Sequence, residues 1–96
     1  MCWAAASDWC EEQNMVLVPI EKMCPSWDGT LFRENKCPEF VGSGYDQYWS
    51  SKISWDDGSS YFALYVTSSG MVNDSEQYYD GFPLCDVSAK ALCYLP

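Results

Sequence analysis

The stretch that decides the fold is Tyr48–Val72, which reads YWSSKISWDDGSSYFALYVTSSGMV. It begins with an aromatic segment, Tyr48–Ser51, which we expect to form a short strand. The polar segment Asp56–Ser60 predicts a turn, because Asp, Gly and Ser favour turn conformations. A second strand is expected at Tyr61–Val66, and Ser68–Gly70 predicts a hairpin connection into a return strand. The stretch therefore predicts an antiparallel meander.

Side chains in the second expected strand alternate strictly, because successive residues of a strand point to opposite faces. Two sets result, with Phe62, Leu64 and Val66 on one face and Tyr61, Ala63 and Tyr65 on the other. We expect helix and loop before the meander. After it we expect a polar and aromatic loop at Asn73–Phe82 and one closing strand at Ala89–Leu95.

The best helix candidate is Trp3–Gln13, which is rich in alanine and glutamate. Its apolar positions have the spacing of one buried helical stripe, namely Trp3, Ala6, Trp9 and Cys10. Asn14 is a plausible left-handed end for this helix. A buried strand at Met15–Val18 and a brief second helix at Ile20–Met23, with Pro19 in its first turn, should follow.

Prolines and an Asp-Gly turn signal predict that Cys24–Cys37 is a loop, which a bridge between its two end cysteines would close. Trp27 lies near the tip of this loop. It either folds back over the base of the loop or is an exposed ring that stacks on a ligand. Val41–Gly44 predicts a flexible joint into the meander.

The chain has 96 residues, six cysteines and no histidine. A domain of this size has a modest core, so an even number of cysteines in a short chain predicts three disulfides. A zinc site is disfavoured because no C-x-x-C pair and no histidine is present. Disulfides persist in oxidising compartments, so we expect a secreted or cell-surface protein. The absence of histidine also excludes Ser-His-Asp and Cys-His catalysis, and we do not expect an enzyme.

The formal net charge of −9 disfavours binding to nucleic acid or to anionic membranes. No segment approaches the roughly 20 apolar residues of a membrane helix, and none has the pattern of an export signal. We therefore expect residues 1–96 to be a single domain taken from a longer exported protein.

These features together resemble the C-type-lectin-like fold. The family's early W..A...C helix matches Trp3, Ala6 and Cys10, and Cys85–Cys93 is similar to its closing cysteine segment. More closely, Tyr48–Ser51, the Tyr61–Val66 strand and the later G-x-V (Gly70 and Val72) resemble a bacterial branch, the FISUMP-type or collagen-like-adhesin C-terminal type. A further similarity, to that branch's R-L-P-T-x-E-E segment, falls on Leu17, Pro19 and Glu21.

The resemblance implies an α+β fold with one or two helices packed on a small twisted antiparallel sheet, long loops and disulfide staples. It implies a bridge from Cys10 to Cys93, and we suggest Cys24 to Cys37 and Cys2 to Cys85 as the others. The family's usual first strand has no counterpart here, which predicts that Leu92–Leu95 lacks its partner. An unpaired edge invites pairing with a second copy or with a strand from a parent chain.

The family's sugar-binding members coordinate calcium through E-P-N or Q-P-D and W-N-D motifs, which this chain lacks. No cofactor is therefore expected, although calcium remains possible. A binding face is expected from the loops around the meander, made of Trp55, Asp56, Asp57, Asn73, Asp74, Glu76, Tyr78 and Tyr79. Alternatively, the rings complete a small core and the acids are only solvated.

The expected function is adhesion, as an extracellular lectin-like module that binds a protein or glycan at a surface. The alternative is a structural subunit or tip domain of a pilus-type appendage that assembles through its open sheet edge.

Overall fold

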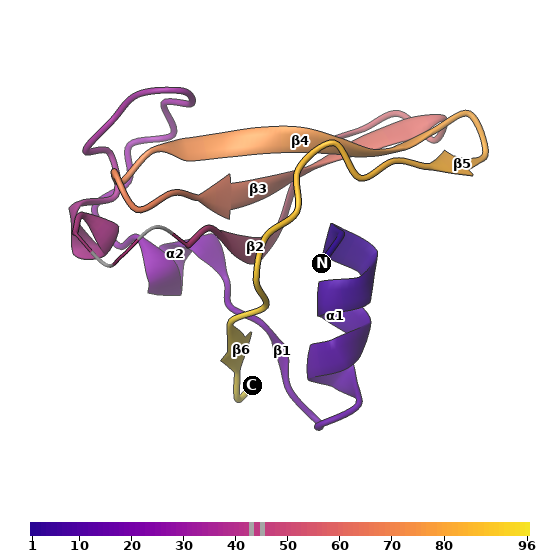
Figure 1. Ribbon diagram of the computed structural model, residues 1–96, viewed down its shortest axis with the longest axis horizontal. Helices are drawn as coiled ribbons and strands as arrows, with labels where there is room; N and C mark the ends of the chain where they lie inside the picture. Colours follow the sequence, from indigo (N-terminus) through magenta and orange to yellow (C-terminus); the bar gives the residue numbers. More distant parts are fainter. Residues whose placement is uncertain (43, 45) are drawn as a thin grey trace.

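The computed structural model describes residues 1–42, 44 and 46–96 and has a small α+β fold (Figure 1). In chain order its elements are α1 (Trp3–Glu11), β1 (Val16–Leu17), α2 (Ile20–Met23), the 3₁₀ helix η1 (Pro38–Phe40), β2 (Tyr48–Asp56), β3 (Ser60–Val66), β4 (Val72–Tyr79), β5 (Phe82–Pro83) and β6 (Cys93–Tyr94). The long strands form an antiparallel sheet in the order β2-β3-β4-β5, and β1 pairs with β6. Over the described part of the chain, none of the helices is long and apolar enough to cross a membrane.

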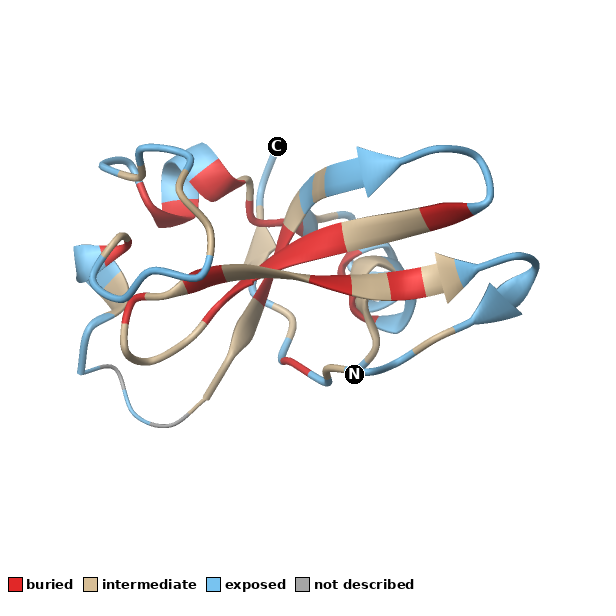
Figure 2. Cartoon of the chain, turned by 90° about the horizontal axis from the view of Figure 1, so that it is seen from above, coloured by how far each residue is buried: buried red, intermediate tan, exposed pale blue. Residues whose placement is uncertain are grey.

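Strand β3 lies in the middle of the sheet and is buried on both faces. Leu64 and Val66 belong to one core, which contains α2, the Cys24–Cys37 disulfide and Val72 and which we call the loop-side core. Ala63 and Tyr65 belong to the helix-side core, in which α1, Trp49 and Leu17 also pack. The alternation that the sequence predicts is therefore confirmed along the buried part of β3. Figure 2 shows buried segments on each of the long strands and exposed residues in the turns that join β2 to β3 and β4 to β5.

Helix α1 covers the helix-side face of the sheet through Ala6 and Cys10, which are fully buried. Trp9 does not share this burial and is 44% exposed, so its predicted place in the buried stripe is wrong. At 3.6 residues per turn Trp9 lies about 100° around the helix from Cys10, beyond the narrow stripe that a nine-residue helix buries.

Asn14 has the predicted left-handed conformation, with φ 60°. The backbone N–H of Trp3 donates to Oε1 of the buried Gln77 (2.8 Å), which ties the first turn to β4.

The loop that Cys24 and Cys37 close covers the loop-side face at the Val72 end of the sheet. Trp27 folds back onto this core and donates its Nε1–H to the Thr30 carbonyl (2.9 Å), which agrees with the first of the two alternatives for this ring.

Asp28 accepts hydrogen bonds from Lys36 Nζ and from the Thr30 N–H, both at 2.9 Å. Lys36 foremost, and then Thr30, hold the pKa of Asp28 well below its usual range. The predicted joint Val41–Gly44 includes Ser43, which lies outside the described residues.

Three predictions about the end of the chain are wrong. The expected loop at Asn73–Phe82 is mostly the long strand β4. Its sequence did not predict a strand because both the buried and the partly exposed residues between Asn73 and Gln77 are polar. The expected strand at Ala89–Leu95 is reduced to the two residues of β6 and an isolated bridge between Lys90 and Tyr48. The segment Leu92–Leu95 is not left without a partner, since β6 pairs with β1 and Leu92 accepts the Val18 N–H.

The three suggested disulfides are all present, and two of them join segments far apart in the sequence. Cys10 is bonded to Cys93, and Cys2 to Cys85, each across 83 residues of sequence. The third bridge, at the base of the Cys24–Cys37 loop, spans 13 residues.

We predict that Gly70→Ala destabilises the protein more than Gly29→Ala does. Both glycines have positive φ, at +78° and +91°, but a Cβ at Gly70 would lie 2.8 Å from a Val41 methyl and 2.9 Å from the Cys37 carbonyl oxygen, whereas Gly29 has open space. The left-handed backbone costs an alanine about 1–2 kcal/mol at either site, and the clash adds about 1–3 kcal/mol at Gly70 alone. Urea unfolding with the disulfides intact measures both variants. Equal losses would show that the packing around Gly70 is wrong.

We also predict that mild reduction opens the Cys2–Cys85 bridge first. A reductant must reach a sulfur to attack it, and Cys85 is exposed while Cys10, Cys24 and Cys37 are almost completely buried. Limited treatment with a phosphine reductant at low pH, followed by alkylation and mass mapping, identifies the first pair that is labelled. The control is the same treatment in strong denaturant, in which the preference should disappear. Early labelling of Cys24 and Cys37 in the folded protein would contradict the prediction.

Candidate functional site

The face of the sheet that carries Leu64 and Val66 continues past the loop-side core to Phe62, where the Cys24–Cys37 loop no longer covers it. Trp55 lies directly opposite Phe62 on β2, and Glu76 lies opposite it on β4. Directly paired residues of antiparallel strands share a face. We call this uncovered surface, made of Ser54, Trp55, Phe62, Asp74 and Glu76, the open face.

Trp55, Phe62 and Asp74 line a pocket of about 350 Å³ on the open face. The Trp55 side chain is 57% exposed and Phe62 is half-buried, so both rings are accessible from solvent. Asp74 forms the polar wall of the pocket. The arrangement offers two aromatic surfaces and one carboxylate to a ligand.

An irregularity in β2 brings a hydroxyl to the same pocket. Between Ile53 and Trp55 the register of β2 against β3 shifts by one residue, and Ser54 is the extra residue. Its hydroxyl lies 3.0 Å from Asp74 Oδ2 and 3.3 Å from the Phe62 carbonyl oxygen, and it can donate to either. The bulge therefore holds the Asp74 carboxylate at the edge of the pocket.

The open face has no internal counterion. The ion pairs among the described residues are Lys36 with Asp28 and Lys90 with Asp46, and neither involves the open face. Lys52, the basic residue of β2, is exposed and makes no ion pair with either Asp74 or Glu76. The carboxylates of the open face are thus left to solvent or to a ligand.

Asp56 and Asp57, two residues of the expected binding face, shape the turn between β2 and β3 instead of lining the pocket. Asp56 Oδ1 accepts the Gly58 N–H at 2.9 Å, and Asp57 Oδ1 accepts the N–H groups of Ser59 and Ser60 at 2.9 and 2.8 Å. The backbone bonds from Ser60 and Ser59, followed by the Trp55 side chain, lower the pKa of Asp57. These carboxylates stabilise the hairpin that presents Trp55.

Asn73 and Tyr78 are turned away from the open face. Asn73 Nδ2 donates to the Tyr65 hydroxyl (3.3 Å) on the helix side of the sheet. Tyr78 stacks on Tyr61, with ring centroids 5.8 Å apart and planes 9° apart, and Tyr61 meets the edge of Trp3. Burial foremost, and then the Asp56 charge, raises the pKa of Tyr61. These residues complete the packing around α1, as the alternative interpretation of the rings expects.

Tyr79 lies one step beyond the pocket, at the end of β4, and is 55% exposed. Its sheet partners are Ser60 on β3 and Phe82 on β5. Because Ser60 and Phe62 alternate with Tyr61 along β3, Tyr79 and Phe82 extend the open face by a second row. Of the eight expected residues, the structure therefore groups Trp55, Asp74, Glu76 and Tyr79.

Sequence reasoning missed three residues of this surface, namely Ser54, Phe62 and Phe82. The signal for Phe62 was present, because it alternates with Leu64 and Val66, but the sequence does not say which of the three the neighbouring loop leaves uncovered. The extra residue at Ser54 becomes visible only when the register of β2 and β3 is known. Phe82 was within the segment expected to be loop.

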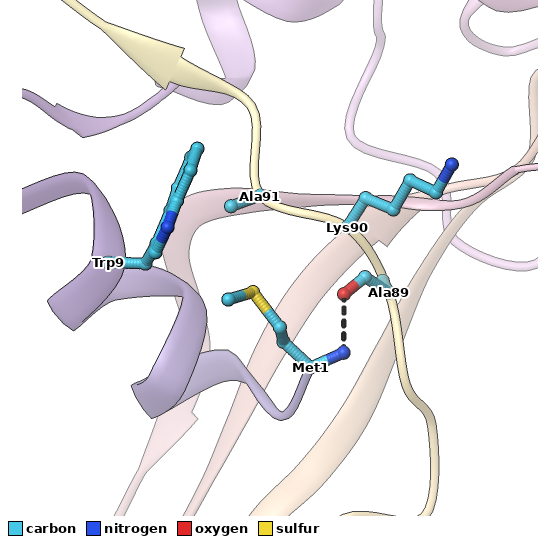
Figure 3. Close-up of a pocket in the computed structure, with 5 residues that line it drawn as sticks. All are labelled: Met1, Trp9, Ala89, Lys90 and Ala91. Atoms are coloured by element: carbon cyan, nitrogen blue, oxygen red, sulfur yellow. Dashed lines mark hydrogen bonds between the residues drawn. The ribbon is translucent and has the colours of Figure 1, made fainter.

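A second pocket, of about 250 Å³, lies between α1 and the chain segment before β6 (Figure 3). It is lined by Met1, Trp9, Ala89, Lys90 and Ala91, and the Met1 nitrogen donates to the Ala89 carbonyl at 3.0 Å. Figure 3 shows Trp9 and Ala91 facing the Met1 side chain while Lys90 points away. The Lys90 ammonium bonds Asp46 at 2.9 Å, so this pocket presents almost only apolar surface.

Within the described ranges, one group of residues has the proximity that a metal site requires, formed by Cys24, Cys37 and Glu39. Both cysteines are joined in a disulfide, so neither offers a thiolate to a metal. The acids of the expected binding face do not form such a group. The geometry around them accordingly gives no support to a calcium site.

We predict that Asp57→Ala lowers the melting temperature, and that Asp57→Asn lowers it less because an amide oxygen can still accept the two N–H groups. The pKa of Asp57 is lowered in the folded state, so the charge stabilises the fold above the ordinary pKa of an aspartate. This contribution is lost as the pH falls through the lowered value. The difference in melting temperature between wild type and Asp57→Asn should therefore narrow when the pH is reduced from 7 to about 2.

Asp86→Asn is the matched control for that series, since Asp86 is exposed and has no hydrogen bond in the described chain. It should melt like the wild type at each pH. A gap between wild type and Asp57→Asn that does not change with pH would show that the carboxylate does not hold the turn.

Comparisons with protein-family models, with curated proteins and with solved structures find no match to this chain. The resemblance to C-type-lectin-like proteins therefore remains a prediction from the sequence motifs.

Proposed function

We propose that this chain is an extracellular binding module of the C-type-lectin-like type, which uses the open face to contact a protein or glycan on a surface. The observation that carries the proposal is the pocket between Trp55 and Phe62 with the Asp74 carboxylate in its wall. An exposed tryptophan costs free energy in an isolated soluble protein, and exposed aromatic rings beside polar groups are typical of contact surfaces.

The rigidity of the open face supports this role. Trp55 stands at the end of a hairpin whose turn is fixed by the hydrogen bonds of Asp56 and Asp57. Phe62 is on β3, whose following residues are buried on both faces. A contact residue that is already ordered loses little conformational entropy when it binds, so such a surface binds more tightly than a mobile one of the same area.

The three disulfides support the extracellular location, since bridges of this kind persist where the environment is oxidising. The Cys10–Cys93 bridge, which the lectin-like resemblance implies, supports the fold assignment. We propose binding rather than catalysis, because the pocket contains one carboxylate and no second titratable group to exchange protons with a substrate.

The appendage-subunit alternative is less well supported. Its premise was an unpaired final strand, and β6 is paired with β1. An assembly role could still use the edge of the long sheet at β4, because β5 pairs with β4 only at Tyr78 and Tyr79. Sedimentation of the purified chain at increasing concentration distinguishes the two functions, since a strand-sharing subunit forms ordered polymers and a binding module stays at low mass.

We predict that the double variant Trp55→Ser/Phe82→Ser loses at least about tenfold in affinity for its ligand, because it removes two exposed rings of the contact surface. The probes are a glycan array and a plate of purified extracellular proteins, each incubated with labelled wild type and variant. Phe32→Ser is the control, since Phe32 is similarly exposed (59%) but lies on the Cys24–Cys37 loop. Equal binding by wild type and double variant, or loss of binding in the control alone, would contradict the proposal.

A further inference from the structure

We infer that the pocket on the open face receives a cationic side chain, the guanidinium of an arginine or the ammonium of a lysine, carried by a protein partner. This inference rests on the proposed function and names the chemistry of the ligand at the same site. Three observations carry it: the shape of the pocket, the hydrogen-bonding capacity of its wall and the charge around it.

The shape suits a flat or compact cation. Trp55 and Phe62 are directly paired across β2 and β3, and their rings line a pocket of about 350 Å³. A cation within about 6 Å of an aromatic ring face is attracted by the ring's quadrupole, most strongly by tryptophan. A pocket with a tryptophan, a second ring and a carboxylate combines this attraction with a charged hydrogen-bond acceptor.

The carboxylate in the pocket wall accepts hydrogen bonds, and the polar side chains next to it already have partners. The Ser54 hydroxyl is directed at Asp74 Oδ2 and the Phe62 carbonyl. The amide of Asn73, next to Asp74, donates on the other side of the sheet. Ammonium and guanidinium groups offer three and five donors and no acceptor, so they match this wall.

A sugar fits the same wall less well, because each of its hydroxyls both donates and accepts. Among the lining residues, the Trp55 indole N–H is the single side-chain donor that could serve those acceptors. A calcium ion fits poorly too. It needs six to eight oxygen ligands, whereas Asp74 is the one carboxylate of the lining.

The surrounding charge favours the same ligand. Glu76 lies beside Asp74 on the open face, and Asp56 and Asp57 follow Trp55 in sequence, with no described ion pair to any of the four. The whole chain has a formal net charge of −9. A field of this sign attracts a basic partner and accelerates its association at low salt. The exposed rings of Tyr79 and Phe82 continue the face beyond the pocket, which suits a protein surface better than a free small cation.

The test follows the binding of two short peptides, acetyl-Gly-Arg-Gly-amide and its citrulline counterpart, by nuclear magnetic resonance of the folded, oxidised protein. Citrulline has the shape of arginine without its charge. The arginine peptide should shift the Trp55 indole signal and the amide signals of Phe62 and Asp74 in a saturable manner. Its affinity should exceed that of the citrulline peptide by about fivefold or more and should fall as salt is added.

Asp74→Asn should weaken the arginine peptide by about fivefold, because it removes the charge and keeps the shape of the wall. Asp8→Asn is the matched control, since Asp8 is an exposed aspartate on α1, which packs on the helix-side face. It should bind like the wild type. Equal affinity for the two peptides, or shifts confined to residues outside the open face, would overturn the inference.

The results separate this inference from the proposed function. If the arrays show binding that depends on Trp55 and the peptides show no preference for charge, the contact surface stands and the cationic ligand is wrong. If the arginine peptide binds at Asp74 but the arrays show no dependence on Trp55 and Phe82, the pocket recognises cations and the wider contact surface is wrong. Binding to neutral glycans alone would support the surface and overturn the cation.

Discussion

The burial of β3 on both faces is the constraint on which the rest of the structure depends. A strand with apolar side chains on both sides needs a cover for each face, and no single element of this chain is large enough to supply both. Helix α1 covers the face of Ala63 and Tyr65, and the Cys24–Cys37 loop with α2 covers that of Leu64 and Val66. Two small cores result, and each depends on a segment that would not stay folded alone.

Disulfides hold these covers in place because the cores are small. Cys10–Cys93 and Cys2–Cys85 fasten both ends of α1 to the last part of the chain, and the third bridge closes the covering loop. In the chain-entropy account, bridges over loops of about 15 and 100 residues contribute about 3 and 5 kcal/mol, and two that span nearly the same loop contribute less than their sum. The elements they fix have few backbone bonds of their own: α2 has four residues, and β1 and β6 have two each.

Much of the fold could be predicted from local patterns, and the predictions failed where the outcome depends on how distant segments pack together. The meander, α1, α2 and the left-handed Asn14 follow from residue spacing and turn chemistry. Strand β4 was missed because most of its buried residues are polar: Gln77 donates to Ser75 and accepts the Trp3 N–H at the start of α1. Trp9 was predicted to be buried, but it is exposed because α1 contacts the sheet along a stripe too narrow to include it. At the site, Trp55 and Asp74 were expected together. Which side chains share their face of the sheet depends on two extra residues, Ser54 in β2 and Gln77 in β4, and no local pattern encodes these.

The position of the open face follows from the same alternation that builds the cores. The face shared by Phe62, Leu64 and Val66 is continuous, and the covering loop reaches it from the Val72 end, where Phe32 donates its N–H to the Val72 carbonyl. The loop is closed at 13 residues by its disulfide, so its reach along the sheet is limited and Phe62 stays uncovered. Phe62 is left half-buried, because β3 extends further along the sheet than the loop that covers it. Asp74 and Glu76 of β4 border this ring, so the surface has both apolar and negative character.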